Sequence, residues 1–198
     1  MVVVVASGHV SDPTLESTRR RLTAKQAGTV DRLGRAAVEL LCREGFAGLT
    51  VRRVAAEAGV GAATAYTYFS SKEHLVAEVF WRRLAGSPPA AHESDDPAVR
   101  VCEVLRHIAL LVADEPEFAG AVTTALLGKE PDVEVLRQRI GSDIRDRLAA
   151  ALGPDTDPDI IDSLEMLYSG ALVRAGMGYA SYTDIAQRLE KSARLILG

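Results

Sequence analysis

The chain has 198 residues, of which 47% are apolar and only 5% aromatic, a balance that favours helices packed through aliphatic side chains over an aromatic-rich β-sandwich. The net charge of −4 taken alone argues against a nucleic-acid partner, because binding phosphates requires clustered Lys and Arg. The charge is unevenly distributed, however: residues 16–86 carry 12 Lys and Arg against 7 Asp and Glu, net +5, and the remainder carries net −9. A basic N-terminal third on an acidic body is typical of a DNA-reading head attached to a body with a different role.

Two cysteines, Cys42 and Cys102, lie in apolar helical patterns without the spacing of a redox pair or a metal-ligand cluster, so we expect buried free thiols. The first residues combine a run of four Val with no basic segment, which is unlike a secretory signal. No stretch approaches the roughly 18 apolar residues of a membrane-spanning helix. We therefore expect a cytoplasmic protein with no membrane partner.

Residues 1–21 show no hydrophobic periodicity and end in consecutive arginines, so we expect a flexible basic arm. These arginines, at 19–21, are either part of a solvated tail or a source of minor-groove contacts. Helical structure should begin at Thr23, since Thr23 and Gln26 form a capping-box pattern. Apolar residues then repeat at helical spacing as far as Gly45, which should end this first helix.

A second helix is expected at residues 51–58, where the Thr50 side chain can cap the first turn. Gly59 should close this helix, because glycine tolerates a left-handed backbone. A short third helix follows at about residues 62–69. Together these segments predict two short helices joined by a tight turn.

A fourth helix should begin after Ser70, which forms a capping-box pattern with Glu73, and should run through Leu84. Residues 86–97 are rich in Gly, Pro, Ser and Asp and predict a loose connection between head and body. Beyond it the pattern is helical throughout, without an internal repeat or a strand pattern. The helices are expected to run from Pro97 through Val112, from Glu115 to Leu127, from Pro131 to just before Gly153, from Pro158 to about Tyr179, and from a Thr183 cap through Leu195.

The second of the two short helices carries an unusual polar set for its length: Thr64, Tyr66, Thr67 and Tyr68. Their hydroxyls can donate hydrogen bonds to phosphates or to base edges, and a helix of this size fits the major groove of DNA. The alternative is an ordinary helical hairpin whose tyrosines belong to the core. The segregated charge and the turn pattern favour DNA binding.

The segment from the first helix through Leu75 resembles the N-terminal domain of the TetR family of bacterial transcriptional regulators. The resemblance rests on the string Ala58-Gly59-Val60, then on Thr64, Tyr66, Tyr68-Phe69 and Ser71-Lys72-Glu73 in the family's order and spacing. It implies an all-α fold with a three-helix helix-turn-helix head at residues 22–74 and a larger ligand-binding and dimerisation body at residues 75–198. It also implies a homodimer, formed through two late helices, that binds a double-stranded DNA operator and is released by a small-molecule effector.

Carried over to this chain, the resemblance implies phosphate contacts from Thr50, Arg52 and Lys72 and DNA contacts from the two tyrosines of the third helix. The chain departs from the family pattern at residues 61–63, where many members carry a capping Ser and a polar residue. Base reading by long side chains is therefore poor, and we expect specificity to rest on thymine-methyl contacts, on threonines and on DNA shape. The predicted DNA-binding set is Thr50, Arg52, Arg53, Gly61, Ala62, Ala63, Thr64, Tyr66, Thr67, Tyr68 and Lys72.

The body carries two further predicted sites. A hydrophobic ligand is expected against the helices at residues 97–127, with His107 as a polar anchor and an apolar lining of Leu111, Phe118, Val122 and Leu126. The run of small residues at 169–178 predicts close packing, either within the subunit or at a dimer seam shared with the helix around residues 136–152. The predicted seam residues are Leu136, Ile140, Ile144, Gly170, Arg174 and Met177.

The sequence shows no catalytic motif, metal site or cofactor site. Glu103 and His107 lie one helical turn apart beside Cys102, but a lone His on a helix is more often structural than a metal ligand. The chain is therefore predicted to be a DNA-binding transcriptional regulator, most simply a repressor released by a hydrophobic effector. The alternatives are a regulator that binds DNA without an effector, and a helical enzyme or lipid carrier.

Overall fold

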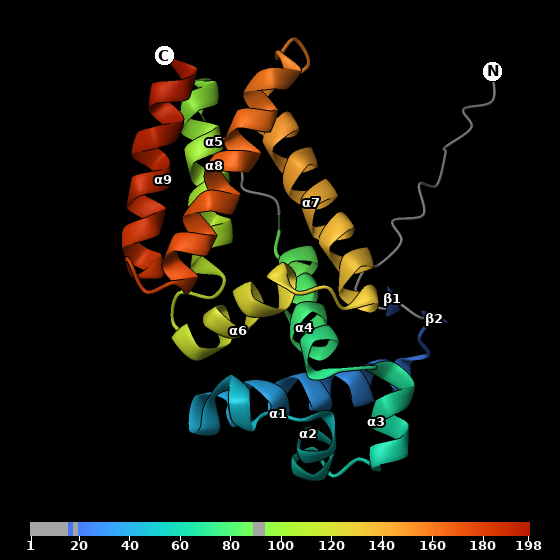
Figure 1. Cartoon of the computed structure of the whole chain (residues 1–198). Helices are drawn as coiled ribbons and strands as arrows, with labels where there is room; N and C mark the ends of the chain where they lie inside the picture. Colours follow the sequence, from blue (N-terminus) through green and yellow to red (C-terminus); the bar gives the residue numbers. More distant parts are fainter. Residues whose placement is uncertain (1–15, 18–19, 89–93) are drawn as a thin grey trace, which may run out of the picture.

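The computed structural model describes residues 16–17, 20–88 and 94–198 (Figure 1). These residues form nine helices and one pairing of two very short strands, so the expected all-α fold is confirmed. The strands β1 (Glu16–Ser17) and β2 (Arg20–Arg21) are antiparallel and lie in the expected basic arm, most of which falls outside the described residues. A strand of two residues is too short to produce a hydrophobic alternation, which is why no strand pattern is visible in the sequence.

Three helices form a small bundle at one end of the molecule: α1 (Ala24–Gly48), α2 (Val51–Glu57) and α3 (Ala62–Tyr68) (Figure 1). As predicted, α1 begins at a reciprocal capping box of Thr23 and Gln26. Gly45, with φ 68° and ψ 177°, interrupts the helix where the sequence indicated its end. The buried sides of the three helices share an aliphatic core that includes Val30, Leu33, Leu41, Leu49, Val54 and Ala65.

The fourth helix, α4 (Lys72–Gly86), runs from this head into the body and packs against α1, α6 and α7 (Figure 1). Its N-cap is Ser71, whose hydroxyl accepts a hydrogen bond from the His74 backbone N–H at 3.0 Å. The predicted capping box of Ser70 with Glu73 is therefore wrong by one residue. Of two adjacent serines, the one with extended backbone directly before the first helical turn holds the cap, and Ser70 is left to contact the body.

The body consists of α5 (Pro97–Leu110), α6 (Pro116–Leu127), α7 (Pro131–Leu152), α8 (Pro158–Gly176) and α9 (Tyr182–Leu197). The first four begin with Pro in the first turn, where its missing N–H removes no helical hydrogen bond. Three predicted bounds are wrong: α5 ends before Val112, α8 ends before Tyr179, and Ser181 rather than Thr183 caps α9. Ser181 holds the cap because it forms a reciprocal capping box with Asp184.

Within the body, α5 packs along α9 and α7, and α8 packs along α9 (Figure 1). The shorter α6 lies across the lower end of this group, where it contacts α1 and α4 of the head side as well as α7 and α8. This position makes α6 a direct mechanical link between the head and the helices of the body.

The two cysteines have different environments. Cys102 is buried in the body as predicted, whereas Cys42 is exposed on α1, so the expectation of a buried thiol is wrong for Cys42. Leu41 is the last buried residue of the apolar stripe of α1, and the next position, Cys42, points about 100° away from it around the helix axis, toward solvent. Among the described residues, no helix combines the length and the apolar composition needed to cross a bilayer.

Candidate functional site

The turn between α2 and α3 is built around Gly59. Its φ of 63° lies in the left-handed region, where any side chain would be strained. The Val60 N–H then donates to the Ala55 carbonyl at 2.8 Å and closes the turn. Ala55 and Ala65 are fully buried, and their small side chains allow α2 and α3 to approach closely. The arrangement is a helix-turn-helix that presents one face of α3 to solvent.

The outer face of α3 is short, polar and accessible. Tyr66 is 49% exposed, and Ala63, Thr64 and Thr67 are exposed beside it. Gly61 is the exposed N-cap, and Ala62 follows it in the first turn. Hydroxyl groups and methyl groups therefore make up this face, and it carries no long charged side chain.

Tyr68 does not belong to this face. Its side chain is buried, with 7% of the residue exposed, and its ring lies 6.4 Å from the Phe69 ring between centroids. The prediction that Tyr68 contacts DNA is corrected accordingly: Tyr68 packs in the core of the head. Two residues apart on a helix are about 200° apart around its axis, so Tyr66 and Tyr68 face opposite ways.

The start of α2 places two of the predicted contact residues at the surface. Thr50 caps the helix, since its Oγ1 accepts the Arg53 N–H at 3.2 Å, and its own hydroxyl proton can still be donated to a phosphate. Arg52 is exposed and forms no ion pair with the described residues. Arg53 instead donates to the Gly48 carbonyl at 2.9 Å and to Glu44 Oε1 at 2.6 Å. Arg53 therefore braces α2 against α1, which leaves Arg52 as the freer cation of the pair.

Lys72 ties the start of α4 to the end of α1. Its Nζ donates to the Phe46 carbonyl at 2.9 Å and lies 4.2 Å from the centroid of the Phe46 ring. An ammonium group has three N–H donors, so one bond to a carbonyl leaves two for another partner. The predicted phosphate contact remains compatible with this placement.

A polar cluster that the sequence analysis missed joins the head to the body. Ser70 follows Phe69, the C-cap of α3. Its Oγ lies 2.5 Å from Asp132 Oδ2, 3.1 Å from Glu130 Oε1 and 3.1 Å from His74 Nδ1. Glu130 is the N-cap of α7, and Asp132 lies in its first turn. The recognition helix α3 is thus hydrogen-bonded, through one intervening residue, to the beginning of α7. The sequence signal for this cluster is the pair of adjacent serines, Ser70 and Ser71. Only one serine can cap α4, so the other is available for another contact.

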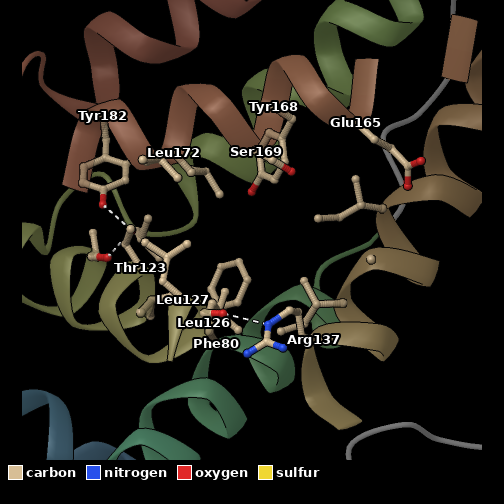
Figure 2. A pocket seen from close by; sticks show the side chains of 17 residues that line it. Phe80, Thr123, Leu126, Leu127, Arg137, Glu165, Tyr168, Ser169, Leu172 and Tyr182 are labelled. Atoms are coloured by element: carbon tan, nitrogen blue, oxygen red, sulfur yellow. Dashed lines mark hydrogen bonds between the residues drawn. The ribbon is translucent and has the colours of Figure 1, made fainter. Parts of the chain in front are cut away.

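A cavity of about 230 Å³ lies in the body between α6, α7 and α8 (Figure 2). Its wall is mostly aliphatic and aromatic. Val122 and Leu126, both predicted to contact a ligand, line it, but Phe118, Leu111 and His107 do not. The lining residues that the sequence analysis did not identify are Phe80, Val112, Ala119, Thr123, Leu127, Arg137, Ile140, Gly141, Ile144, Glu165, Tyr168, Ser169, Leu172, Val173 and Tyr182.

The three excluded residues have structural roles. The Phe118 side chain is fully buried, and the Arg83 guanidinium lies 4.4 Å from its ring centroid. His107 Nε2 is hydrogen-bonded to Ser87 Oγ, while Leu111 is the C-cap of α5. Burial lowers the pKa of His107, and the nearby positive charge of Arg147 lowers it further. The prediction of His107 as a ligand anchor is therefore wrong: it joins the end of α4 to α5.

Polar groups are few in the cavity wall. Tyr182 Oη lies 3.3 Å from Thr123 Oγ1, and Tyr168 lines the wall from α8, next to Ser169 (Figure 2). Arg137 donates from Nε to the Leu126 carbonyl at 2.7 Å and from Nη2 to the Gly128 carbonyl at 2.6 Å. Arg137 therefore holds the end of α6 and the connection to α7 at the edge of the cavity. Tyr168 could have been found from sequence, since it follows Leu164 and precedes Leu172 at helical spacing.

The predicted dimer residues fall into two groups. Leu136, Ile140 and Ile144 are 0%, 6% and 5% exposed, because α7 turns its apolar stripe to the core and cavity of its own subunit. The prediction that these three residues contact a partner subunit is therefore wrong. The other three are exposed, as a surface for a partner requires: Gly170 and Arg174 on α8, and Met177 at its C-cap.

Comparison with known proteins agrees with the helix-turn-helix geometry. Residues 33–79 match the family described as bacterial regulatory proteins, tetR family. The chain is 43% identical to an uncharacterized HTH-type transcriptional regulator of Mycobacterium tuberculosis, over 100% of this chain and 92% of the relative. It is 27% identical to the HTH-type transcriptional repressor KstR of Rhodococcus jostii, over 82% of this chain and 80% of KstR.

Solved structures share the fold. A TetR transcriptional regulator from Rhodococcus sp. RHA1 superposes with a TM-score of 0.72 at 23% identity, covering 87% of this chain and 97% of that one. Thermus thermophilus FadR, a TetR-family transcriptional repressor in complex with lauroyl-CoA, superposes with a TM-score of 0.59 at 25% identity, covering 85% and 93%. The chain thus belongs to the TetR family and is a DNA-binding helix-turn-helix transcriptional regulator.

Proposed function

We propose that this regulator is a repressor that binds a near-palindromic operator as a homodimer and leaves it when a small apolar effector fills the cavity. One observation carries the proposal: α6 lines the cavity with Val122 and Leu126 and also packs against α1 and α4. A molecule that enters the cavity therefore presses on a helix that supports the head. The names of KstR and FadR, both repressors, support the same direction of control.

Contacts to DNA come from the exposed residues of the head. Tyr66, Thr64 and Thr67 face the major groove from α3, while Thr50 and Arg52 meet the phosphate backbone at the start of α2. The methyl groups of Ala62 and Ala63 suit thymine C5-methyl groups. With so few base-reading groups, sequence preference depends partly on DNA shape.

The partner subunit is expected to pack on α8. Met166 on α8 and Met177 at its C-cap are 70% and 65% exposed, and Gly170 of the same helix leaves room for close approach. Exposed methionines on a helix that is otherwise packed in the body favour an interface. Two copies joined at this face place two α3 helices in successive major grooves, about 34–36 Å apart.

Two structural connections can carry a movement of the cavity wall, caused by a bound ligand, to α3. The first is α6 itself, held at its end by Arg137. The second is the polar cluster in which Ser70 contacts Asp132 and Glu130 at the beginning of α7, the helix that supplies Arg137, Ile140 and Ile144 to the cavity wall. Movement of α6 or α7 by a ligand changes the spacing of the two heads in a dimer and thereby weakens operator binding.

The test is binding to a fluorescently labelled DNA fragment from upstream of its own coding sequence, measured by anisotropy at several salt concentrations. The wild type should bind with strong salt dependence. Tyr66→Ala and Lys72→Ala should weaken binding, whereas Tyr68→Phe, which alters a buried hydroxyl, should not. Binding that ignores both Tyr66→Ala and Lys72→Ala contradicts the proposal.

A further inference from the structure

Tyr168 offers the cavity a hydroxyl group that the described part of the chain does not use. The residue is 4% exposed and lines the cavity from α8 (Figure 2). Its Oη makes no hydrogen bond with any described residue. Its oxygen is accessible from the cavity and not fully enclosed by protein, so an acceptor atom of a ligand in the cavity can take its proton.

The second tyrosine of the wall is different, because its donor is already engaged. Thr123 Oγ1 donates to the Ala119 carbonyl at 3.1 Å, which uses the only hydroxyl proton of Thr123. Tyr182 must then be the donor in its 3.3 Å contact with Thr123 Oγ1. The donor of Tyr182 is thus used within the wall. Among the described lining residues, Tyr168 offers a hydroxyl donor from a buried side chain, and Ser169 offers one from an exposed side chain.

The charged residues of the wall are also engaged. The Arg137 guanidinium bonds two carbonyls and pairs with Glu134, and Glu165 pairs with Arg145 at 2.5 Å. The described cation of the wall is therefore Arg137, which already has two carbonyls and Glu134 as partners. Burial raises the pKa of both Tyr168 and Tyr182, in line with an environment that disfavours negative charge. A ligand carboxylate would lose its hydration here and would have to compete with Glu134 for Arg137.

We propose that the effector is a neutral lipophilic molecule with a carbonyl or hydroxyl oxygen that accepts a hydrogen bond from Tyr168. The inference rests on the proposed effector function and narrows it to a chemical class. A cavity of about 230 Å³ holds a small molecule of this kind. It is smaller than the common range of about 300–1,000 Å³ for ligand pockets, and the one cation described in its wall, Arg137, already pairs with Glu134 and cannot balance the several phosphate charges of a CoA ester.

The test is isothermal titration calorimetry of the full chain with probes of matched length: 2-decanone, 1-decanol and decanoate, with lauroyl-CoA as a fourth. The two neutral probes should bind at least tenfold more tightly than decanoate or lauroyl-CoA. Tyr168→Phe keeps the ring and removes the hydroxyl, so it should weaken 2-decanone binding about tenfold, the value of one net hydrogen bond. Tyr179→Phe is the matched control, because Tyr179 is 69% exposed and lies outside the cavity wall, and it should bind like the wild type.

Three results would overturn the inference: tighter binding of decanoate or lauroyl-CoA, unchanged 2-decanone binding by Tyr168→Phe, or no binding of either neutral probe. DNA binding by the same preparations separates this inference from the function on which it rests. A protein that binds its operator but shows no preference for neutral probes contradicts only the ligand class. A protein that binds the neutral probes but no DNA contradicts the proposed function.

Discussion

The contact between Ser70 and the first turn of α7 predicts that Ser70→Ala loosens the head from the body. The substitution removes a hydroxyl 2.5 Å from Asp132 Oδ2 while leaving the cap of α4, Ser71, intact. A hydrogen bond to a charged group contributes about 1.5–3 kcal/mol. The Asp132 side chain is 28% exposed, so water replaces part of the lost bond and the lower end of that range, about 1.5 kcal/mol, applies.

For a chain of this length, 1 kcal/mol corresponds to a shift of about 2–4 °C in the melting temperature, so Ser70→Ala should melt about 3–6 °C lower. Thermal unfolding followed by circular dichroism, at one fixed protein concentration, measures the shift. Ser142→Ala is the matched control, because Ser142 is exposed on α7 and makes no hydrogen bond with the described residues. A Ser70→Ala melting temperature within 1 °C of the wild type would show that this contact does not hold the head.

Three further predictions follow from burial and charge. Tyr68→Ala should lower the free energy of unfolding by about 3 kcal/mol, since it empties a buried aromatic site, whereas Tyr66→Ala should leave the melting temperature unchanged and reduce operator affinity about tenfold. Burial and Arg147 lower the pKa of His107 in the folded chain from 6.5, so below that pH the unfolded chain binds more protons than the folded chain does. The stability that neutral His107 contributes is therefore complete above pH 6.5 and is lost as the pH falls. His107→Gln should therefore flatten the decline of melting temperature between about pH 7 and pH 5, and an equally steep decline would contradict the assignment. Met177→Glu places a charge at the exposed C-cap of α8 and should convert a dimer to a monomer in sedimentation velocity without lowering helical content; a persistent dimer would place the interface elsewhere.

Local signals in the sequence predicted the head well. The Thr23 capping box, the Thr50 cap and the left-handed Gly59 are each decided by a few neighbouring residues, and the structure has all three. The cap of α4 was misplaced by one residue because both Ser70 and Ser71 satisfy the pattern. The choice between them depends on the contact of Ser70 with α7, which is 62 residues away in the chain.

Long-range packing explains the errors in the body. The stripe of Ile140 and Ile144 shows which face of α7 is buried, but an apolar stripe does not reveal whether its partner is the same subunit or another copy. The cavity has residues from α4, α6, α7, α8 and α9 and from the connection between α5 and α6, so no local pattern marks it. His107 was predicted to be the polar anchor of a ligand, but its ring is bonded to Ser87, and the cavity wall has Tyr168 instead.

Hydroxyl-radical footprinting of the upstream DNA fragment is the most direct test of the account that this chain is an operator-binding dimer. The account predicts two protected patches related by a dyad, with centres separated by one helical turn of DNA or a small multiple of it. Protection should disappear for Tyr66→Ala and persist for Tyr68→Phe. A single patch without dyad symmetry, or protection that survives Tyr66→Ala, would contradict the claim that two α3 helices read the operator.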